Sequence, residues 1–351
     1  MPLTLYVDGA RWHAHQQQVL TAHPGIVPVL KGNGYGFGLP RLAEQAATLG
    51  VDTVAVGMYH EVEAVAGFSE PTGGSVLVMS PWRPFETGAV LSPHVVHTVG
   101  RVADLRALAA LGSEGRRPRV VLERLTSMRR HGFSARGLRE AARLLDGVTV
   151  EGVAVHLPLA RGAHLAEVQR LMTDVVAAGL PSRRVYVSHL SEVELSSLRR
   201  AYPDYELRPR IGTELWLGDR AALSVRATVL DTHPVHRGDV FGYRGRAAPV
   251  AGTILVVSGG TSHGIALEAP TGAASARDRA VRLVEGGLDA AGLVRSPYTV
   301  GGKQRLFAEP PHMQASMLFL PRGTSVPVVG DEVDVRVRFT TTAFDRTVVS
   351  D

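Results

Sequence analysis

Eight short runs of β-branched and apolar residues alternate with helical patterns between residues 27 and 218, and this alternation limits the possible folds most. Apolar residues recur at helical spacing in the segments that separate the runs. Eight strand–helix units match the count of a (β/α)8 TIM-type barrel, and an open doubly wound sheet is the weaker alternative. The expected strands are Val27–Lys31, Thr53–Met58, Ser75–Ser80, His94–Val99, Arg119–Arg124, Val150–His156, Arg184–His189 and Leu207–Ile211. The clearest helices are Leu39–Leu49, Val102–Leu111, Leu138–Leu145, Leu165–Ala178 and Glu192–Ala201.

After Gly218 the pattern changes to short strands with Gly and Pro turns, which is typical of a mostly-β domain. A chain of 351 residues has room for a large α/β domain and a smaller one. We therefore expect a barrel over 8–219 and a β-domain over 220–351, which the N-terminal strand 1–7 joins. The strands expected there are Ala221–Leu230, Asp239–Tyr243, Gly252–Ser258, Gly264–Leu267, Met313–Leu320 and Glu332–Phe339, with one helix at Ala273–Leu288.

Composition excludes several classes of protein. The chain has no Cys, which excludes disulfides, thiolate metal sites and a Cys nucleophile. No stretch approaches the ~20 apolar residues of a membrane helix. The sequence pI is about 9.8, but Arg residues come in ones and twos without interleaved aromatics, so no nucleic-acid partner is predicted. We expect a cytoplasmic protein that acts on a small molecule.

Lysine is rare in this chain, since only Lys31 and Lys303 occur among 38 basic residues. Lys31 ends the first expected strand and precedes the glycine-rich turn 32–38. Unlike Arg, a Lys in a shielded pocket can become a neutral amine. Such an amine forms a Schiff base with a carbonyl cofactor, of which pyridoxal phosphate is the usual one. Lys31 is therefore the first candidate for a catalytic residue.

Other polar residues lie at the ends of later strands, where barrel enzymes place their chemistry. We expect these side chains to converge with Lys31 on the C-terminal mouth of the barrel. They are Arg130 after the fifth strand, His156 on the sixth, His189 and Ser191 after the seventh, and Arg210 in the eighth.

Two motifs resemble those of a known family. Lys31, Asn33, Tyr35, Gly36 and Gly38 fill a Lys-x-Asn-x-Tyr-Gly-x-Gly pattern, and the segment 126–133 reads Thr-Ser-Met-Arg-Arg-His-Gly-Phe. These motifs, and the order of strands around them, resemble the alanine racemase family of fold-type III pyridoxal phosphate enzymes. The resemblance extends over essentially the whole chain.

The resemblance implies a set of cofactor contacts. Lys31 would carry pyridoxal 5′-phosphate as a Schiff base, and Tyr35 would bond its phosphate. Arg130 would contact the phenolic oxygen of the cofactor and the carboxylate of the substrate. Glu123 stands where many members have a carbamylated Lys that supports this Arg. His156 would pack on the pyridine ring.

The eighth-strand segment implies further contacts. Arg210 would face the pyridine nitrogen, which keeps that nitrogen unprotonated and favours simple return of a proton to the substrate. Gly212 and Thr213 would offer backbone N–H groups to the phosphate. Ser191 is the nearest match to the family's phosphate-binding Ser, although Val193 fits that position in another alignment.

The C-terminal domain departs from the family at the catalytic Tyr, which lies in a Gly-Tyr-Ala-Asp-Gly motif. This chain reads Ser-Gly-Gly-Thr-Ser-His-Gly over 258–264, so that Thr261 or, without a gap, Ser258 replaces the Tyr. A hydroxyl is a poor base without activation. His263 is the natural substitute, and on a strand it would share a face with Thr261. Met313 would still offer its N–H to the substrate carboxylate.

The sequence therefore predicts a pyridoxal phosphate-dependent amino-acid racemase or epimerase, with Lys31 as the base on one face of the substrate. The second base is expected from the Thr261 and His263 region of a partner subunit, since family members are homodimers that share their sites. Two alternatives remain open. One is a single-base enzyme that acts on D-amino acids by elimination, aldol cleavage or decarboxylation, and the other is a non-catalytic pyridoxal phosphate-binding protein. No metal is expected, and the sequence does not specify the amino acid.

Overall fold

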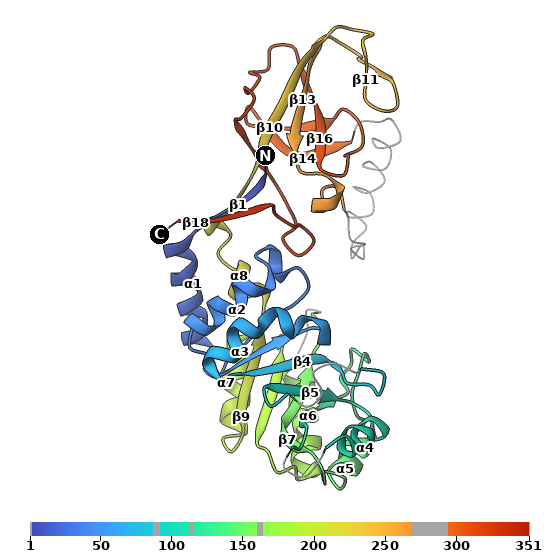
Figure 1. The fold of residues 1–351 in the computed structure, drawn as a ribbon. Helices are drawn as coiled ribbons and strands as arrows, with labels where there is room; N and C mark the ends of the chain where they lie inside the picture. Colours follow the sequence, from blue (N-terminus) through green and yellow to red (C-terminus); the bar gives the residue numbers. More distant parts are fainter. Residues whose placement is uncertain (1, 87–91, 113–115, 160–163, 268–293, 351) are drawn as a thin grey trace. The chain divides into compact units, whose positions relative to one another are not determined.

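The computed structural model describes residues 2–86, 92–112, 116–159, 164–267 and 294–350. The chain divides into two compact units (Figure 1). The barrel unit is His13–Gly218, and the β-unit joins Met1–Trp12 to Asp219–Asp351. No helix in these described ranges combines the length and the apolar character that crossing a membrane requires.

The barrel unit contains a closed barrel of eight parallel strands, which confirms the predicted fold class. The strands are β2 (Val27–Leu30), β3 (Thr53–Val56), β4 (Ser75–Pro81), β5 (Val95–Val99), β6 (Arg119–Arg124), β7 (Thr149–His156), β8 (Arg184–Ser188) and β9 (Glu206–Ile211). β9 closes the barrel by pairing with β2, with Val27 opposite Arg210. The C-terminal ends of all eight strands therefore lie at one mouth of the barrel.

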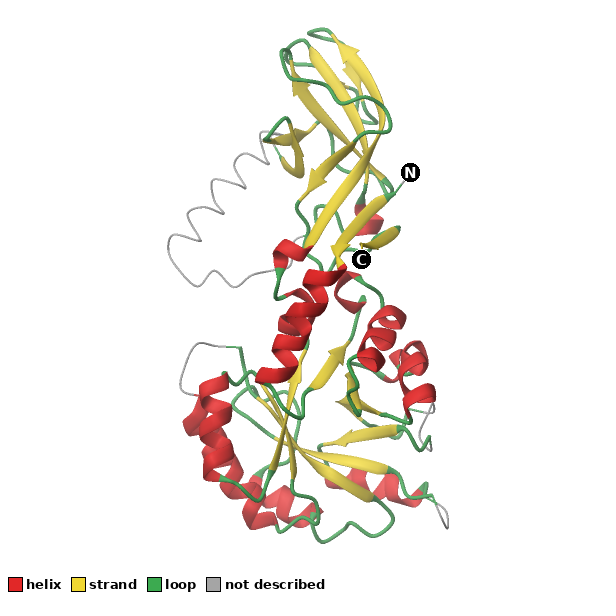
Figure 2. Ribbon diagram, turned by 90° about the vertical axis from the view of Figure 1, so that its left-hand side faces the viewer, coloured by secondary structure: helices red, strands yellow, loops and turns green. Residues whose placement is uncertain are grey.

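Helices cover the outside of the barrel, as Figure 2 shows. The helices are α1 (Gly9–Ala22), α2 (Leu39–Thr48), α3 (Ala66–Thr72), α4 (Val102–Ala110), α5 (Ala135–Ala141), α6 (His164–Ala178), α7 (Glu192–Ala201) and α8 (Thr213–Leu217). Parallel strands that are buried on both faces are largely apolar. Every residue of β2 and β3 is buried, and Thr53 is the one polar residue among them. Side chains from successive strands fill the interior: Val27, Val29, Ala55, Leu77, Val96, Val121, Ala154 and Tyr186. The barrel is thus a packed support for its mouth.

The β-unit is built on an eight-stranded sheet in the order β13-β16-β15-β14-β17-β10-β1-β18. Its strands are β1 (Leu3–Asp8), β10 (Leu223–Val235), β13 (Gly252–Ser258), β14 (Arg295–Val300), β15 (Lys303–Phe307), β16 (Ala315–Pro321), β17 (Glu332–Val335) and β18 (Arg346–Ser350). A separate hairpin pairs β11 (Val240–Phe241) with β12 (Arg246–Ala247). The N-terminal β1 lies between β10 and β18.

Several elements differ from expectation, and the strands β12, β14, β15 and β18 were not predicted. The strand predicted at Gly264–Leu267 is wrong, because a 3₁₀ turn, η5 (Thr261–His263), leads into Gly264 with φ of 80°. The helix predicted at Leu138–Leu145 begins earlier, at Ala135, because the Ser134 side chain accepts a hydrogen bond from the Gly137 N–H and caps it. The helix predicted at Ala273–Leu288 lies outside the described residues.

Candidate active site

Five titratable side chains lie at the C-terminal mouth of the barrel. Lys31 follows β2, Arg130 lies between β6 and α5, His156 ends β7, His189 follows β8 and Arg210 lies in β9. The pKa of His156 is lowered to about 3, first by burial and then by the charges of Arg210, Arg130, His189 and Lys31. The mouth thus gathers the side chains into one electrostatic cluster with an excess of positive charge, which suits an anionic ligand.

The surroundings of Lys31 lower the pKa of its side-chain amine. Burial lowers its pKa, the charges of Arg130 and Arg210 lower it further, and Glu61 opposes them. A lowered pKa leaves a larger neutral fraction of the amine at neutral pH. The side chain still reaches solvent, so that a ligand can approach it. Lys31 is therefore the candidate nucleophilic amine of this site.

Glu61, in the turn η2 (Tyr59–Glu61), holds the backbone beside Lys31, and sequence reasoning missed it. Its carboxylate accepts the Gly32 N–H at 2.6 Å, the Gly57 N–H at 2.7 Å and the Met58 N–H at 2.9 Å. These bonds join the chain after β2 to the chain after β3. An acidic residue in a turn carries no sequence signal for such a role, because its partners are backbone groups.

Arg210 and Glu123 are buried beneath the mouth, with exposed fractions of 6% and 4%. Burial raises the pKa of Glu123, while the charge of Arg210, and then that of Arg130, lowers it. The charge of Arg210 thus affects the pKa of Glu123 more than the charge of Arg130 does, and the support of Arg130 by Glu123 stays a prediction. The Arg210 Nη2 donates to the Val155 carbonyl at 3.3 Å, but its buried Nε has no hydrogen-bond partner among the described residues. A buried donor without an acceptor is costly, so this N–H is a ready contact for a ligand atom.

Two histidines form one wall of the site. The rings of His156 and His189 meet edge to face, with centroids 5.1 Å apart. Burial and neighbouring cations lower the pKa of both, so that both rings are neutral at pH 7. Thr126 ties the Arg130 segment to this wall by donating its hydroxyl to the His156 carbonyl at 2.7 Å.

Tyr35 lies in the glycine-rich turn η1 (Gly34–Gly36) and is 5% exposed. Its φ of 55° is in the left-handed region, which Arg129 and His189 also adopt. Non-glycine residues in that region store strain and cluster at functional sites. The Tyr35 hydroxyl lies so near Gly212 that a Cβ there would overlap it. Tyr35 and Gly212 thus lie together at one side of the mouth, and Thr213 follows as the first residue of α8.

Ser191, the expected phosphate contact, lies at the start of α7 (Glu192–Ala201). It is the N-cap of α7, where its hydroxyl accepts the Glu194 N–H at 3.3 Å and donates to the Glu194 carboxylate at 2.9 Å. The negative charge of Glu194 opposes a phosphate at this hydroxyl. The structure therefore gives Ser191 a capping role.

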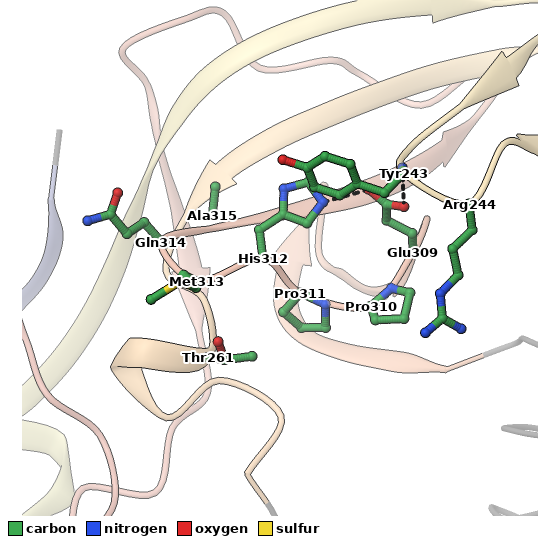
Figure 3. A pocket seen from close by; sticks show the side chains of 10 residues that line it. All are labelled: Tyr243, Arg244, Thr261, Glu309, Pro310, Pro311, His312, Met313, Gln314 and Ala315. Atoms are coloured by element: carbon green, nitrogen blue, oxygen red, sulfur yellow. Dashed lines mark hydrogen bonds and ion pairs between the residues drawn. The ribbon is translucent and has the colours of Figure 1, made fainter.

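The other three candidate residues belong to the β-unit. Thr261 and Met313 line a cavity of about 640 Å³, in which Figure 3 shows both side chains. His263 does not share a strand face with Thr261, because both lie in the turn η5. Its Nε2 bonds the Asp345 carboxylate at 3.0 Å and its Nδ1 accepts the Gly260 N–H at 3.2 Å. Both ring nitrogens are thus engaged in holding the β-unit together.

Within the described part of the chain, no three His, Cys, Asp or Glu side chains gather as metal ligands would.

The model of the alanine racemase N-terminal domain matches residues 9–204, which is more than half of the chain. The alanine racemase of Desulforamulus reducens is 33% identical over 142 residues, which are 38% of this chain. That match spans 37% of the relative's length.

Solved structures show the same fold. The structure of alanine racemase from Bartonella henselae with covalently bound pyridoxal phosphate has a TM-score of 0.72 and 14% identity. The match covers 99% of this chain and 100% of that one. Histidine racemase from Leuconostoc mesenteroides subsp. sake has a TM-score of 0.71 and 18% identity, covering 99% and 98%. At identities below 25%, these matches show that the fold is shared.

Proposed function

Because this chain belongs to the alanine racemase family, we propose that it is a pyridoxal 5′-phosphate-dependent amino-acid racemase or epimerase. The observation that carries the proposal is Lys31 at the end of β2, with its pKa lowered between Arg130 and Arg210. Family membership supports the cofactor, and the Bartonella henselae structure holds it covalently bound.

The residues of the barrel mouth fit pyridoxal phosphate. Lys31 would hold it covalently, Tyr35 with the backbone of Gly212 and Thr213 would hold its phosphate, and the neutral His156 would pack on its ring. The Arg210 Nε–H, which has no partner in the described part of the chain, would supply the donor that a ring nitrogen needs. When bound, the cofactor stabilises negative charge at the substrate Cα, and an Arg donor limits how far that charge is drawn away.

The chain's own side chains then orient the substrate and move the proton. Arg130 binds the substrate carboxylate, because a guanidinium forms a fixed fork that matches a carboxylate. Lys31 exchanges a proton with Cα on one face of the substrate, and Glu61 fixes the backbone from which Lys31 projects. Inversion requires a second group on the opposite face.

We assign the second group to the β-unit of a partner subunit in a homodimer, as the family relationship implies. Thr261 and Met313 line the cavity of that unit, and Met313 would offer its N–H to the substrate carboxylate. His263 is committed to Asp345 and Gly260, so that its contribution is to position this region. The proposal thus divides the chemistry between the barrel of one chain and the β-unit of another.

The test begins with cofactor attachment. Wild-type protein loaded with pyridoxal phosphate and reduced with borohydride should carry the adduct on Lys31, as mass spectrometry of its peptides would show. Lys31→Ala should abolish the adduct and the visible absorbance band. Lys303→Ala removes the only other lysine and should change neither. An adduct on Lys303 alone would contradict the proposal.

The second step measures deuterium incorporation at Cα over a panel of L- and D-amino acids. Exchange with inversion supports the racemase. Exchange with retention, or release of a keto acid, would instead identify a single-base enzyme that acts on one enantiomer. A loaded protein that exchanges nothing in the panel would be a pyridoxal phosphate-binding protein without this catalysis.

A further inference from the structure

A carboxylate–imidazole pair lies in the cavity of the β-unit that Thr261 and Met313 line. The His312 Nε2 is 2.6 Å from the Glu309 Oε1, and the other Glu309 oxygen accepts the Tyr243 N–H at 2.9 Å. The Glu309 side chain is 2% exposed, whereas that of His312 is 30% exposed. Figure 3 shows the His312 ring against the Tyr243 ring, with the Glu309 carboxylate alongside.

The local sequence builds this pair. Pro310 and Pro311 separate its two members, and each proline fixes its own φ, which limits the freedom of the segment. Gly242 lies against the Glu309 carboxylate, where a Cβ would overlap it, and has a φ of 73°. The Tyr243 ring packs on the His312 ring with centroids 4.7 Å apart. Gly242 and the Tyr243 N–H therefore fix the Glu309 carboxylate, and the Tyr243 ring fixes the His312 ring.

The hydrogen bond sets the tautomer of His312. The Glu309 carboxylate is an acceptor, so the Nε2 carries the proton and donates it. The Nδ1 then keeps its lone pair, and it has no hydrogen-bond partner among the residues that the structure describes. An imidazole that is oriented by a buried carboxylate and has a free nitrogen is the arrangement of a general base.

We propose that His312, oriented by Glu309, is the second proton-transfer residue of this enzyme. The inference rests on the proposed function, and it replaces the expectation that placed this role at Thr261 or His263. His263 has both ring nitrogens bonded within the β-unit, whereas the Nδ1 of His312 has no partner among the described residues. His312 also directly precedes Met313, the residue assigned to the substrate carboxylate, which places the base and the carboxylate contact on one segment.

The Nδ1 of His312 accepts the Cα proton of one enantiomer, and the electron pair of the broken bond remains with the substrate. The Lys31 ammonium delivers a proton to the opposite face, and a new C–H bond forms. His312 ends with one proton more and Lys31 with one fewer, and exchange with solvent restores both. In the reverse reaction the roles are exchanged, and Glu309 stabilises the imidazolium whenever it forms.

His312→Gln tests the inference in loaded enzyme with an amino acid that wild type inverts. Inversion should fall about 100-fold or more. Deuterium exchange with retention, at the enantiomer whose proton faces Lys31, should survive at a comparable rate. His233→Gln is the matched control, because His233 is an exposed histidine paired with Asp231 at 3.3 Å on β10, outside the cavity. It should leave inversion unchanged.

The outcomes separate the two proposals. If wild type inverts no amino acid, the proposed function fails. If wild type inverts and His312→Gln inverts as fast, the inference about His312 fails and the racemase remains. Equal loss of inversion and of retention-type exchange would also overturn it, because a second base serves one face only.

A spectroscopic measurement is independent of turnover and of how His312→Gln folds. In loaded protein with ¹⁵N-labelled histidine, His312 should show a protonated Nε2 and a bare Nδ1. Glu309→Gln preserves the shape of the side chain but removes its charge, and it should shift the His312 signals while leaving those of His233 unchanged. A proton on Nδ1 in the neutral ring, or no response to Glu309→Gln, would overturn the role of this pair.

Discussion

The reactivity of Lys31 follows from the charges around one nitrogen. Burial, Arg130 and Arg210 all disfavour the ammonium, while Glu61 favours it, and the balance lowers the pKa. The neutral amine of the apo-protein should therefore appear with a midpoint below 10.5 as the pH rises. Removing a neighbouring cation should move the midpoint up, whereas removing the Glu61 charge should move it down.

Competitive labelling with an amine-reactive reagent at a series of pH values measures this midpoint. Because Lys303 is the only other lysine, its peptide serves as the internal reference. Arg130→Met should raise the midpoint of Lys31 and Glu61→Gln should lower it. A midpoint at or above 10.5 in the wild type would contradict the electrostatic account.

Glu61 itself should be important for stability as well as for reactivity. Its carboxylate satisfies three backbone N–H groups, and Glu61→Gln would turn an –NH₂ group toward at least one of them. We expect the free energy of unfolding of the apo-protein to fall by about 1–3 kcal/mol. Denaturant unfolding measures the change, and Glu63→Gln, at an exposed neighbour, is the control. Equal stability of the two variants would refute this role of Glu61.

At the scale of elements, alternation of strands and helices was a sufficient signal for the barrel. All eight barrel strands occur within a few residues of their expected bounds, because the residues of buried parallel strands are largely apolar. The β-unit was harder to predict. β15 (Lys303–Phe307) is mostly polar, and Gly264–Leu267 is apolar but follows a turn that its neighbours impose. Short strands that are exposed on one face carry a weaker pattern.

Some residues of the candidate site could be predicted from the sequence and others could not. Lys31, Arg130, His156 and Arg210 could be placed because strand ends in a barrel face one mouth. Glu61 could not, since its partners are backbone groups. The pair of Glu309 and His312 was missed because it depends on the approach of the β11–β12 hairpin, which brings Tyr243 to both residues from more than 60 positions away.

The position of Tyr35 in the glycine-rich turn should depend on Gly212 at the start of α8, because the two residues are in close contact. Gly212→Ala adds a methyl group that overlaps the buried Tyr35 hydroxyl, so that Tyr35 must move. Overpacking of this kind costs about 1–3 kcal/mol of stability. Affinity for pyridoxal phosphate, measured by absorbance titration of the apo-protein, should fall as well.

Gly67→Ala in α3 is the matched control, because a Cβ there meets nothing within 4 Å and a helix favours Ala. It should leave the cofactor affinity unchanged and the stability equal or slightly higher. Wild-type affinity in Gly212→Ala would show that Tyr35 does not need its observed position.

For the whole molecule, the proposals predict that two chains share each site. Lys31→Ala and His312→Gln should each be inactive in inversion. Unfolding a mixture of the two and refolding it together should give mixed dimers, in which one of two sites combines an intact barrel with an intact β-unit. Activity should then return to about a quarter of the wild-type level, since half of randomly paired dimers are mixed.

Two further measurements complete this test. Light scattering should give twice the mass of 37.5 kDa for the loaded protein. Mixing Lys31→Ala with Arg130→Met is the control, because both changes lie in the barrel unit and no pairing restores an intact one. Failure of the first mixture to recover, with dimers present, would show that the proton-transfer groups come from a single chain.

The position of β1 has a consequence for how the protein is made. β1 pairs with β10, Leu3 opposite Ala227, and with β18, Thr4 opposite Arg346. The barrel unit is thus an insertion between one strand of a sheet and the rest of it. At a ribosomal rate of about 5–20 residues per second, the apolar strand Leu3–Asp8 waits on the order of 10–40 s for its first neighbour. During that interval the barrel unit is synthesised while β1, on its N-terminal side, has no strand to pair with. A chaperone or another nascent chain can bind this unpaired strand.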